Sequence, residues 1–261
     1  MPPGNFNNIG NRIIRLKSVR STNDYAYQLA ARGMPEGCIV VAEEQTAGKG
    51  RLGRQWNSPR QQGLWFSVIL RPLIPSRLVT LFPFLASVAV AQSIQTCFQI
   101  TPHLKWPNDL LINHKKIGGI LTEAATESNV IKFIILGIGI NVYQQPEDFP
   151  PALRAKAGSI SLFTTREIDL NQFFRQIQQD FNSDYSLAQK HGFTPILKRW
   201  KSLCKELHQP ITLHHNNQIL SGIFYDLAVD GGLLLQQPNR LIKIVAGEIQ
   251  FEKENSNAVS D

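Results

Sequence analysis

The sequence is poor in cysteine. Its 261 residues contain only Cys38, Cys97 and Cys204, which lie far apart and form no C-x-x-C pair. An odd number of isolated cysteines argues against a disulfide framework and against a zinc site. We therefore expect a reducing compartment and a cytoplasmic protein, with no metal-ligating residues of its own.

Targeting signals and long apolar runs are also lacking. Met1–Asn5 has no basic region followed by an apolar core, as a secretory signal would have. Between Arg77 and Lys105 there is no Lys, Arg, Asp or Glu, and Leu81–Phe98 is rich in apolar residues. Polar residues interrupt that stretch, and its apolar run is shorter than the ~20 residues that a membrane span needs. It predicts a helix buried under a sheet, and no membrane partner.

Acidic residues are missing from one long interval, residues 45 to 108. The interval nevertheless contains Lys49, Arg51, Arg54, Arg60, Arg71, Arg77 and Lys105. With a net charge of +7 and a pI of about 9.4, the chain is expected to meet an anion: a nucleotide, an acidic protein or a nucleic acid. Charge alone does not choose among these. The 43% hydrophobic content is ordinary for a folded globular protein.

What is present is a loop, Gln45–Trp56, in which glycines alternate with cations. It joins two β-rich runs, Cys38–Ala42 and Gly63–Leu70. Its glycines formally satisfy G-x-G-x-x-G, but that dinucleotide motif requires a helix directly after it, and a strand follows here. A kinase-type phosphate lid would need H-R-D and D-F-G motifs, which the sequence lacks. The loop is therefore predicted to bind an anion in some other way.

Four further motifs accompany this loop. Ser21–Asp24 is a helix cap whose structural role is complete without a ligand. Lys105–Asp109 (KWPND) interrupts a strand predicted over residues 103–112, and is either an ordinary turn or a functional break. Lys116–Leu121 and Gly137–Asn141 carry glycines inside strands, which either relieve packing or leave a groove for a ligand.

The second half of the chain changes character twice. A polar, proline-rich connection is followed by two amphipathic helices, one containing Leu170–Tyr185 and the other Ile196–Leu203. After Cys204, short strands separated by turn signals predict a small β-barrel. The final residues, Glu252–Asp261, are expected to fray.

In order and spacing these motifs resemble those of the biotin–protein ligases, over roughly Arg12 to Phe251. The resemblance implies an α+β fold: a mixed central sheet flanked by helices, like the catalytic domains of class II aminoacyl-tRNA synthetases and biotin–lipoate ligases, with a small C-terminal SH3-like β-barrel. It implies a catalytic domain at 1–204 and a C-terminal domain at 205–261. It further implies ATP, biotin and Mg²⁺, with formation of biotinyl-5′-AMP and transfer of biotin to a lysine of the biotin carboxyl carrier protein of acetyl-CoA carboxylase.

The resemblance also assigns residues to roles, some of them to more than one. The implied catalytic residues are Arg51, Lys116, Asp109 and Lys105. The implied biotin-binding residues are Ser21, Thr22, Asn23, Gln45, Lys49, Gly50, Arg51, Lys116 and Gly118. The implied ATP and adenylate contacts are Lys49, Arg51, Arg54, Trp56, Asn108, Lys116 and Asn141. Lys49 departs from the pattern, which often has Arg there, so a bidentate phosphate contact is lost.

Two other functions remain open at this point. Lipoate–protein ligases have a related fold and the same two-step mechanism through an acyl-adenylate, although the loop and the KWPND motif favour biotin. Some biotin–protein ligases also bind DNA as repressors through an added N-terminal helix-turn-helix. Only about 20 residues precede Ser21 here, too few for a helix-turn-helix domain, so we expect no DNA binding. A homodimer is left open.

Overall fold

The computed structural model describes residues 8–128, 130–216 and 218–249. A seven-stranded sheet has the order β1-β2-β3-β7-β6-β5-β4. β1 and β2 are parallel and the other neighbours are antiparallel, so the sheet is mixed, as expected. The strands are β1 (Arg12–Leu16), β2 (Cys38–Ala42), β3 (Gly63–Leu70), β4 (His103–Lys105), β5 (Asp109–Ile112), β6 (Lys115–Glu127) and β7 (Val130–Asn141).

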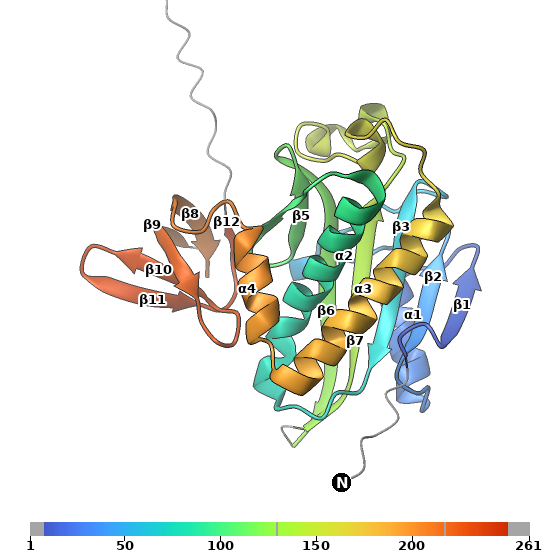
Figure 1. The fold of residues 1–261 in the computed structure, drawn as a ribbon, viewed down its shortest axis with the longest axis horizontal. Coiled ribbons are helices and arrows are strands. Elements are labelled where there is room, and N and C mark those ends of the chain that lie inside the picture. Colours follow the sequence, from blue (N-terminus) through green and yellow to red (C-terminus); the bar gives the residue numbers. More distant parts are fainter. Residues whose placement is uncertain (1–7, 129, 217, 250–261) are drawn as a thin grey trace, which may run out of the picture.

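Helices cover both faces of this sheet. α2 (Phe82–Phe98) and α3 (Leu170–His191) lie side by side across one face, with α4 (Thr194–Ser202) beside them, while α1 (Thr22–Ala31) packs against β2, β3 and β7 (Figure 1). Successive side chains of a strand point to opposite faces. Accordingly Ile39 belongs to the large core on the α2 side, and Val40 to the smaller core under α1. The predicted α+β architecture is confirmed.

The long apolar helix is a core helix. The segment Ser76–Phe98 is long and apolar enough to cross a membrane, yet most of it is buried inside the protein. Its buried serines are hydrogen-bonded: Ser87 donates to the carbonyl of Phe84, and Ser93 contacts the carbonyl of Ala89 and the carboxylate of Asp180 in α3. The predicted buried helix is therefore confirmed.

The KWPND region differs from the prediction of one interrupted strand. β4 and β5 are two antiparallel strands, with Lys105 opposite Asp109, and Trp106–Asn108 form the turn between them. The Trp106–Pro107 peptide is cis, and proline has no N–H with which to continue a strand ladder. The reversal brings Lys105 and Asp109 next to each other.

The C-terminal region is a five-stranded antiparallel sheet of order β11-β10-β9-β8-β12, which matches the expected SH3-like unit. Its strands are β8 (Pro210–His215), β9 (Gln218–Leu227), β10 (Leu233–Gln237), β11 (Arg240–Ile244) and β12 (Glu248–Ile249). It joins the larger sheet through Trp106, whose indole N–H donates to the carbonyl of Gly231 at 3.0 Å. The tail expected to fray, Glu252–Asp261, lies outside the described residues.

Candidate functional site

A strip of the central sheet on the α1 side carries no side chains. Gly119 of β6 lies opposite Gly139 of β7. Gly137 precedes Gly139 by two residues in β7 and lies opposite Ser67 of β3. Opposite residues of antiparallel strands face the same side, so these glycines form a bare surface where the apolar core under α1 ends. We call Gly119, Gly137 and Gly139 the groove floor.

The neighbouring Gly118 points to the other face of the sheet. A Cβ there would meet the side chain of Leu110, which belongs to the core on the α2 side. Of the two adjacent glycines, the sequence reasoning selected Gly118, but Gly119 is the one that faces the groove. Successive residues of a strand face opposite sides of the sheet, so only one of the two glycines can face the groove. Which one does so depends on the strand register, and the sequence does not reveal that register.

Trp56 lies on the groove floor. A Cβ at Gly139 would be 2.6 Å from its indole nitrogen, and one at Gly119 would be 3.3 Å from its six-membered ring. That nitrogen is buried and has no hydrogen-bond partner among the described residues. Gly48 supports this geometry, because a Cβ there would lie 2.6 Å from the carbonyl oxygen of Trp56. The loop can therefore fold onto the floor only with glycine at both Gly48 and Gly139.

The start of α1 forms one wall of the groove. Ser21 caps the helix, and the backbone N–H of Thr22 donates to Gln45 Oε1 at 2.8 Å. Gln45 Nε2 donates to Ser58 Oγ at 2.9 Å. The expected biotin residues Ser21, Thr22, Asn23 and Gln45 are thus brought together from two segments of the chain.

Asn23 continues this wall across the sheet. Its Nδ2 donates to Glu123 Oε2 at 2.7 Å, and its Oδ1 accepts from Ser67 Oγ at 2.6 Å. Ser58, Ser67 and Glu123 did not stand out in the sequence. The available signal was a single serine inside the otherwise apolar run of β3.

Charged side chains gather at the other end of the floor. Lys116 Nζ lies 2.7 Å from Asp109 Oδ1 and 5.4 Å from the centre of the Trp56 ring. Arg51 donates to Asn108 Oδ1 at 3.2 Å and to the carbonyl oxygen of Gly247 at 3.4 Å. The turn between β4 and β5 and the start of β6 therefore meet the glycine loop here.

Burial changes the pKa of two cations at this end of the groove, Lys105 and Arg51. Lys105 is 4% exposed, and burial lowers its pKa from 10.5 to about 8, against the opposing influence of nearby carboxylates. Burial also lowers the pKa of Arg51, while Asp109 opposes this. The site thus holds positive charge in a poorly hydrated place, where it interacts strongly with an anion.

Three expected site residues are engaged elsewhere. Lys49 is paired with Asp24, whose hydrogen bond raises the pKa of that lysine. Arg54 is paired with Glu248 of β12, and this contact raises the pKa of Arg54. Asn141 is buried: its Nδ2 donates to the carbonyl of Gly158 at 2.9 Å, and its Oδ1 accepts from Gln144 at 3.2 Å.

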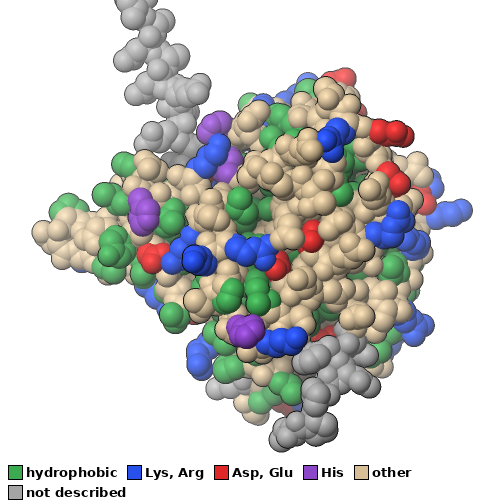
Figure 2. All heavy atoms as spheres, viewed as in Figure 1, with side chains coloured by type: hydrophobic (Ala, Val, Ile, Leu, Met, Phe, Trp, Pro, Cys, Tyr) green, Lys and Arg blue, Asp and Glu red, His purple; other side chains and the backbone are tan. Residues whose placement is uncertain are grey.

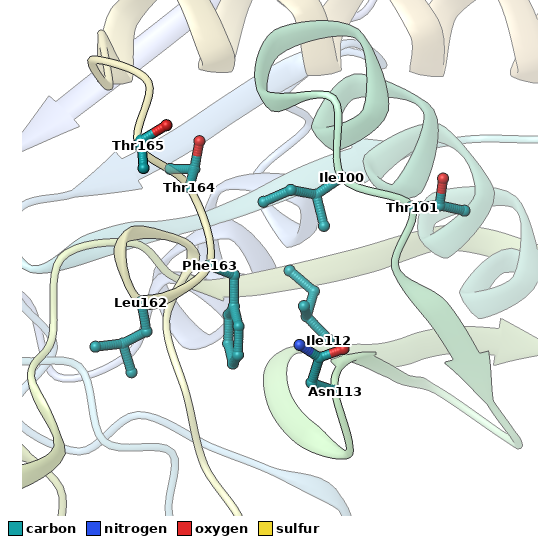
Figure 3. Close-up of a pocket in the computed structure, with 8 residues that line it drawn as sticks. All are labelled: Ile100, Thr101, Ile112, Asn113, Leu162, Phe163, Thr164 and Thr165. Atoms are coloured by element: carbon teal, nitrogen blue, oxygen red, sulfur yellow. The ribbon is translucent and has the colours of Figure 1, made fainter.

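Of two pockets, one lies on the α2 side of the sheet and the other belongs to this site. One of about 450 Å³ lies between the end of α2, the β5–β6 turn and residues 162–165, and no charged side chain lines it (Figure 3). A second, of about 340 Å³, is formed by residues 44–46 and 55–59 and includes Gln45, Trp56 and Ser58. On the face that carries α2 and α3, the Lys and Arg side chains are dispersed among the others (Figure 2). Among the described residues, the glycines, the hydrogen-bonding wall and the cations Lys105, Lys116 and Arg51 meet at the groove floor, and we place the functional site there.

Two protein families match parts of this chain. Residues 16–141 match the Biotin/lipoate A/B protein ligase family, and residues 207–252 match the Biotin protein ligase C terminal domain. The chain is 41% identical over 247 residues to the "Bifunctional ligase/repressor BirA" of Bacillus subtilis, covering 93% of this chain and 75% of that protein. It belongs to the biotin protein ligase family.

Other biotin protein ligases extend the comparison. The "Biotin--[acetyl-CoA-carboxylase] ligase" of Mycobacterium tuberculosis is 30% identical over 237 residues, which cover 88% of this chain and 85% of the relative. The structure titled "Biotin protein ligase from Aquifex aeolicus in complex with biotin and ATP" superposes with a TM-score of 0.76 at 26% identity, over 92% of this chain and 98% of the other. The biotin protein ligase fold therefore includes both sheets of this chain.

Proposed function

We propose that this chain is an ATP-dependent ligase that joins biotin to AMP and then transfers the biotinyl group to a lysine of the biotin carboxyl carrier protein of acetyl-CoA carboxylase. One observation carries the proposal: a bare strip of sheet runs from a hydrogen-bonding wall to a cluster of cations, of which Lys105 is buried. A neutral, hydrogen-bonding ring system with an acidic tail fits such a groove. The family, and the names of the similar ligases, support biotin as that acid.

In this proposal the ring end of biotin meets the wall formed by Ser21, Thr22, Asn23 and Gln45. Its tail lies along the groove floor, and its carboxylate reaches Lys116 and Arg51. Lys49 and Gly50 belong to the loop that closes over the ligand. Trp56 covers the floor, so biotin can lie along the floor only if the indole moves, and we assign the moved indole to the adenine.

The phosphate end is assigned to the cations at the other end of the groove floor. Lys105, Lys116 and Arg51 lie where two anions, the carboxylate and the α-phosphate, have to approach each other. Fixed positive charge that is already in place lowers the barrier to such a reaction. Asn108 holds Arg51. Arg54 and Asn141 are also assigned to the nucleotide, although the side chains of both are paired within the protein.

Mg²⁺ fits this donor set as a partner of the nucleotide. No group of three His, Cys, Asp or Glu side chains in the described parts of the chain is arranged to hold a metal. Mg²⁺ commonly binds through substrate phosphates and one or two carboxylates, and Asp109, which is ion-paired with Lys116, is a carboxylate at this end of the groove. When bound, the ion would neutralise phosphate charge.

The transfer step is assigned to Asp109. The amine of the carrier lysine attacks the carbonyl carbon of the biotinyl-adenylate, the bond to the phosphate oxygen breaks, and AMP leaves. The nitrogen loses a proton in this step, and Asp109 can accept it. The ion pair with Lys116 holds the carboxylate at the reacting end of the groove.

The finer assignments belong to the same proposal. We assign a catalytic domain to 1–204 and a C-terminal domain to 205–261; the separation of the strands into two sheets supports this. A cytoplasmic location and the absence of DNA binding are parts of the proposal, and a homodimer is left open.

The deciding experiment is acid-dependent ATP–pyrophosphate exchange with the purified protein. We expect exchange with biotin to exceed exchange with lipoate at least tenfold, and to be followed by biotinylation of an added carrier domain. Equal exchange with both acids, or exchange with lipoate alone, would overturn the assignment of biotin. Salt-sensitive binding to one DNA sequence would show a further repressor function.

A further inference from the structure

The centre of β3 contains a buried hydroxyl that the proposed function does not use. Ser67 is 0% exposed, lies between Phe66 and Val68, and points to the α1 side of the sheet, level with Gly137. Its Oγ is 2.6 Å from Asn23 Oδ1 and 2.8 Å from Thr22 Oγ1. A serine at the middle of a buried strand is therefore in direct contact with two residues of the groove wall.

These contacts determine which way the amide of Asn23 faces. The Oδ1 atom can only accept a hydrogen bond, so the hydroxyl proton of Ser67 is directed to it. The Nδ2 group can only donate, and Glu123 Oε2 accepts from it at 2.7 Å. With a donor on one side and a carboxylate on the other, one of the two amide orientations is strongly favoured. The wall then presents a defined hydrogen-bonding pattern.

Packing confines the same side chain further. A Cβ at Gly137 would overlap the Asn23 amide, so this side chain lies directly on the groove floor. Asn23 is 4% exposed. Gln45 is held in a comparable way, with Thr22 donating to its oxygen and its nitrogen donating to Ser58. Ser58 holds the amide of Gln45 and Ser67 holds that of Asn23, and of these two serines only Ser67 lies within β3.

We propose that Ser67 is a positioning residue that gives the groove its selectivity for an acid whose ring carries a urea-type group. This proposal rests on the proposed function. Such a ring presents N–H donors and one carbonyl acceptor at fixed positions. A wall of oriented amides matches that pattern, whereas an apolar ring leaves buried polar groups without partners, which is a strong basis for rejection. Ser67 acts through Asn23 and Thr22, without itself touching the ligand.

The first test compares Ser67→Ala with Ser87→Ala. Ser87 is also buried, but it lies in α2 on the opposite side of the sheet, where its hydroxyl donates to the carbonyl of Phe84. In pyrophosphate exchange we expect Ser67→Ala to raise KM for biotin about tenfold, the usual scale for one lost hydrogen bond, with kcat changed by less than about threefold. The biotin-to-lipoate ratio of kcat/KM is expected to fall by the same factor, and Ser87→Ala is expected to change neither value.

A merely structural role for Ser67 predicts another pattern. It would lower the melting temperature and the activity with both acids together, and would leave their ratio unchanged. That result, or an unchanged KM for biotin, would overturn the proposal.

A second measurement does not depend on biotin. In the unliganded protein, the two Nδ2 protons of Asn23 are expected to give separate NMR signals that exchange slowly with solvent. Ser67→Ala is expected to speed that exchange at least tenfold. An unchanged rate would refute the positioning role. If the wild-type protein activates neither acid, the proposed function fails, and the Asn23 signal still decides whether Ser67 orients this amide.

Discussion

Replacing Lys105 with Met is expected to stabilise the protein at neutral pH while slowing adenylation. Lys105 is 4% exposed, and burial lowers its pKa from 10.5 to about 8. At about 1.4 kcal/mol for each pH unit, keeping this lysine charged in the folded state costs about 3 kcal/mol. Methionine has a similar length and no charge, so Lys105→Met is expected to recover a large part of that free energy.

The pH dependence follows from the direction of the shift. Between about pH 8 and 10.5 the unfolded chain holds a proton on Lys105 that the folded chain has released. The free energy of unfolding therefore gains a positive contribution from this residue as pH rises through that window, and the full destabilisation is present below pH 8. Lys105→Met lacks this contribution. Its free energy of unfolding is therefore expected to exceed that of the wild type most below pH 8, and the difference is expected to vanish near pH 10.5.

Urea denaturation at pH 7 and at pH 10 measures both effects. Lys198→Met removes an exposed lysine of α4 and serves as the control for the loss of one positive charge. In parallel, biotin-dependent pyrophosphate exchange is expected to fall at least a hundredfold in Lys105→Met. If the difference in unfolding free energy between Lys105→Met and the wild type is the same at both pH values, the reasoning from burial is wrong.

Three further substitutions test other parts of the site. Asp109→Asn is expected to slow biotin transfer to the carrier more than pyrophosphate exchange; the opposite order in parallel assays would remove its role as proton acceptor. Gly137→Ala places a methyl group into the amide of Asn23, so thermal unfolding is expected to show a loss of about 1–3 kcal/mol together with weaker biotin binding. Arg51→Gly is expected to speed release of biotinyl-5′-AMP more than release of biotin in dissociation measurements; equal effects would refute its assignment to the phosphate.

Much of the secondary structure could be predicted from local sequence. The strands Cys38–Ala42 and Gly63–Leu70 occur at the predicted residues. The helix after Ser21 begins where its cap predicts, with Ser21 Oγ accepting from the N–H of Asp24. These features depend on neighbours within a few positions. The KWPND segment was predicted less well, because a turn that reverses the chain and a break in one strand have similar local sequences.

The candidate site was predicted in its residue types more reliably than in its geometry. The glycine loop, Lys116 and the start of α1 do meet, as the motifs implied. Lys49 and Arg54 are instead paired with Asp24 and Glu248. These ion pairs form between side chains 25 and 194 positions apart, so no local pattern contains them.

The sequence by itself determined the elements, the cationic loop and the set of motifs, because capping, side-chain period and glycine content act over short distances. Tertiary structure decided which glycine faces the groove, which serine holds Asn23, and where Trp56 rests. Each depends on strand register: a shift of one residue turns every side chain of a strand to the other face. Gly118 and Gly119 are equal in sequence, and only the pairing of Gly119 with Gly139 places one of them beneath Trp56.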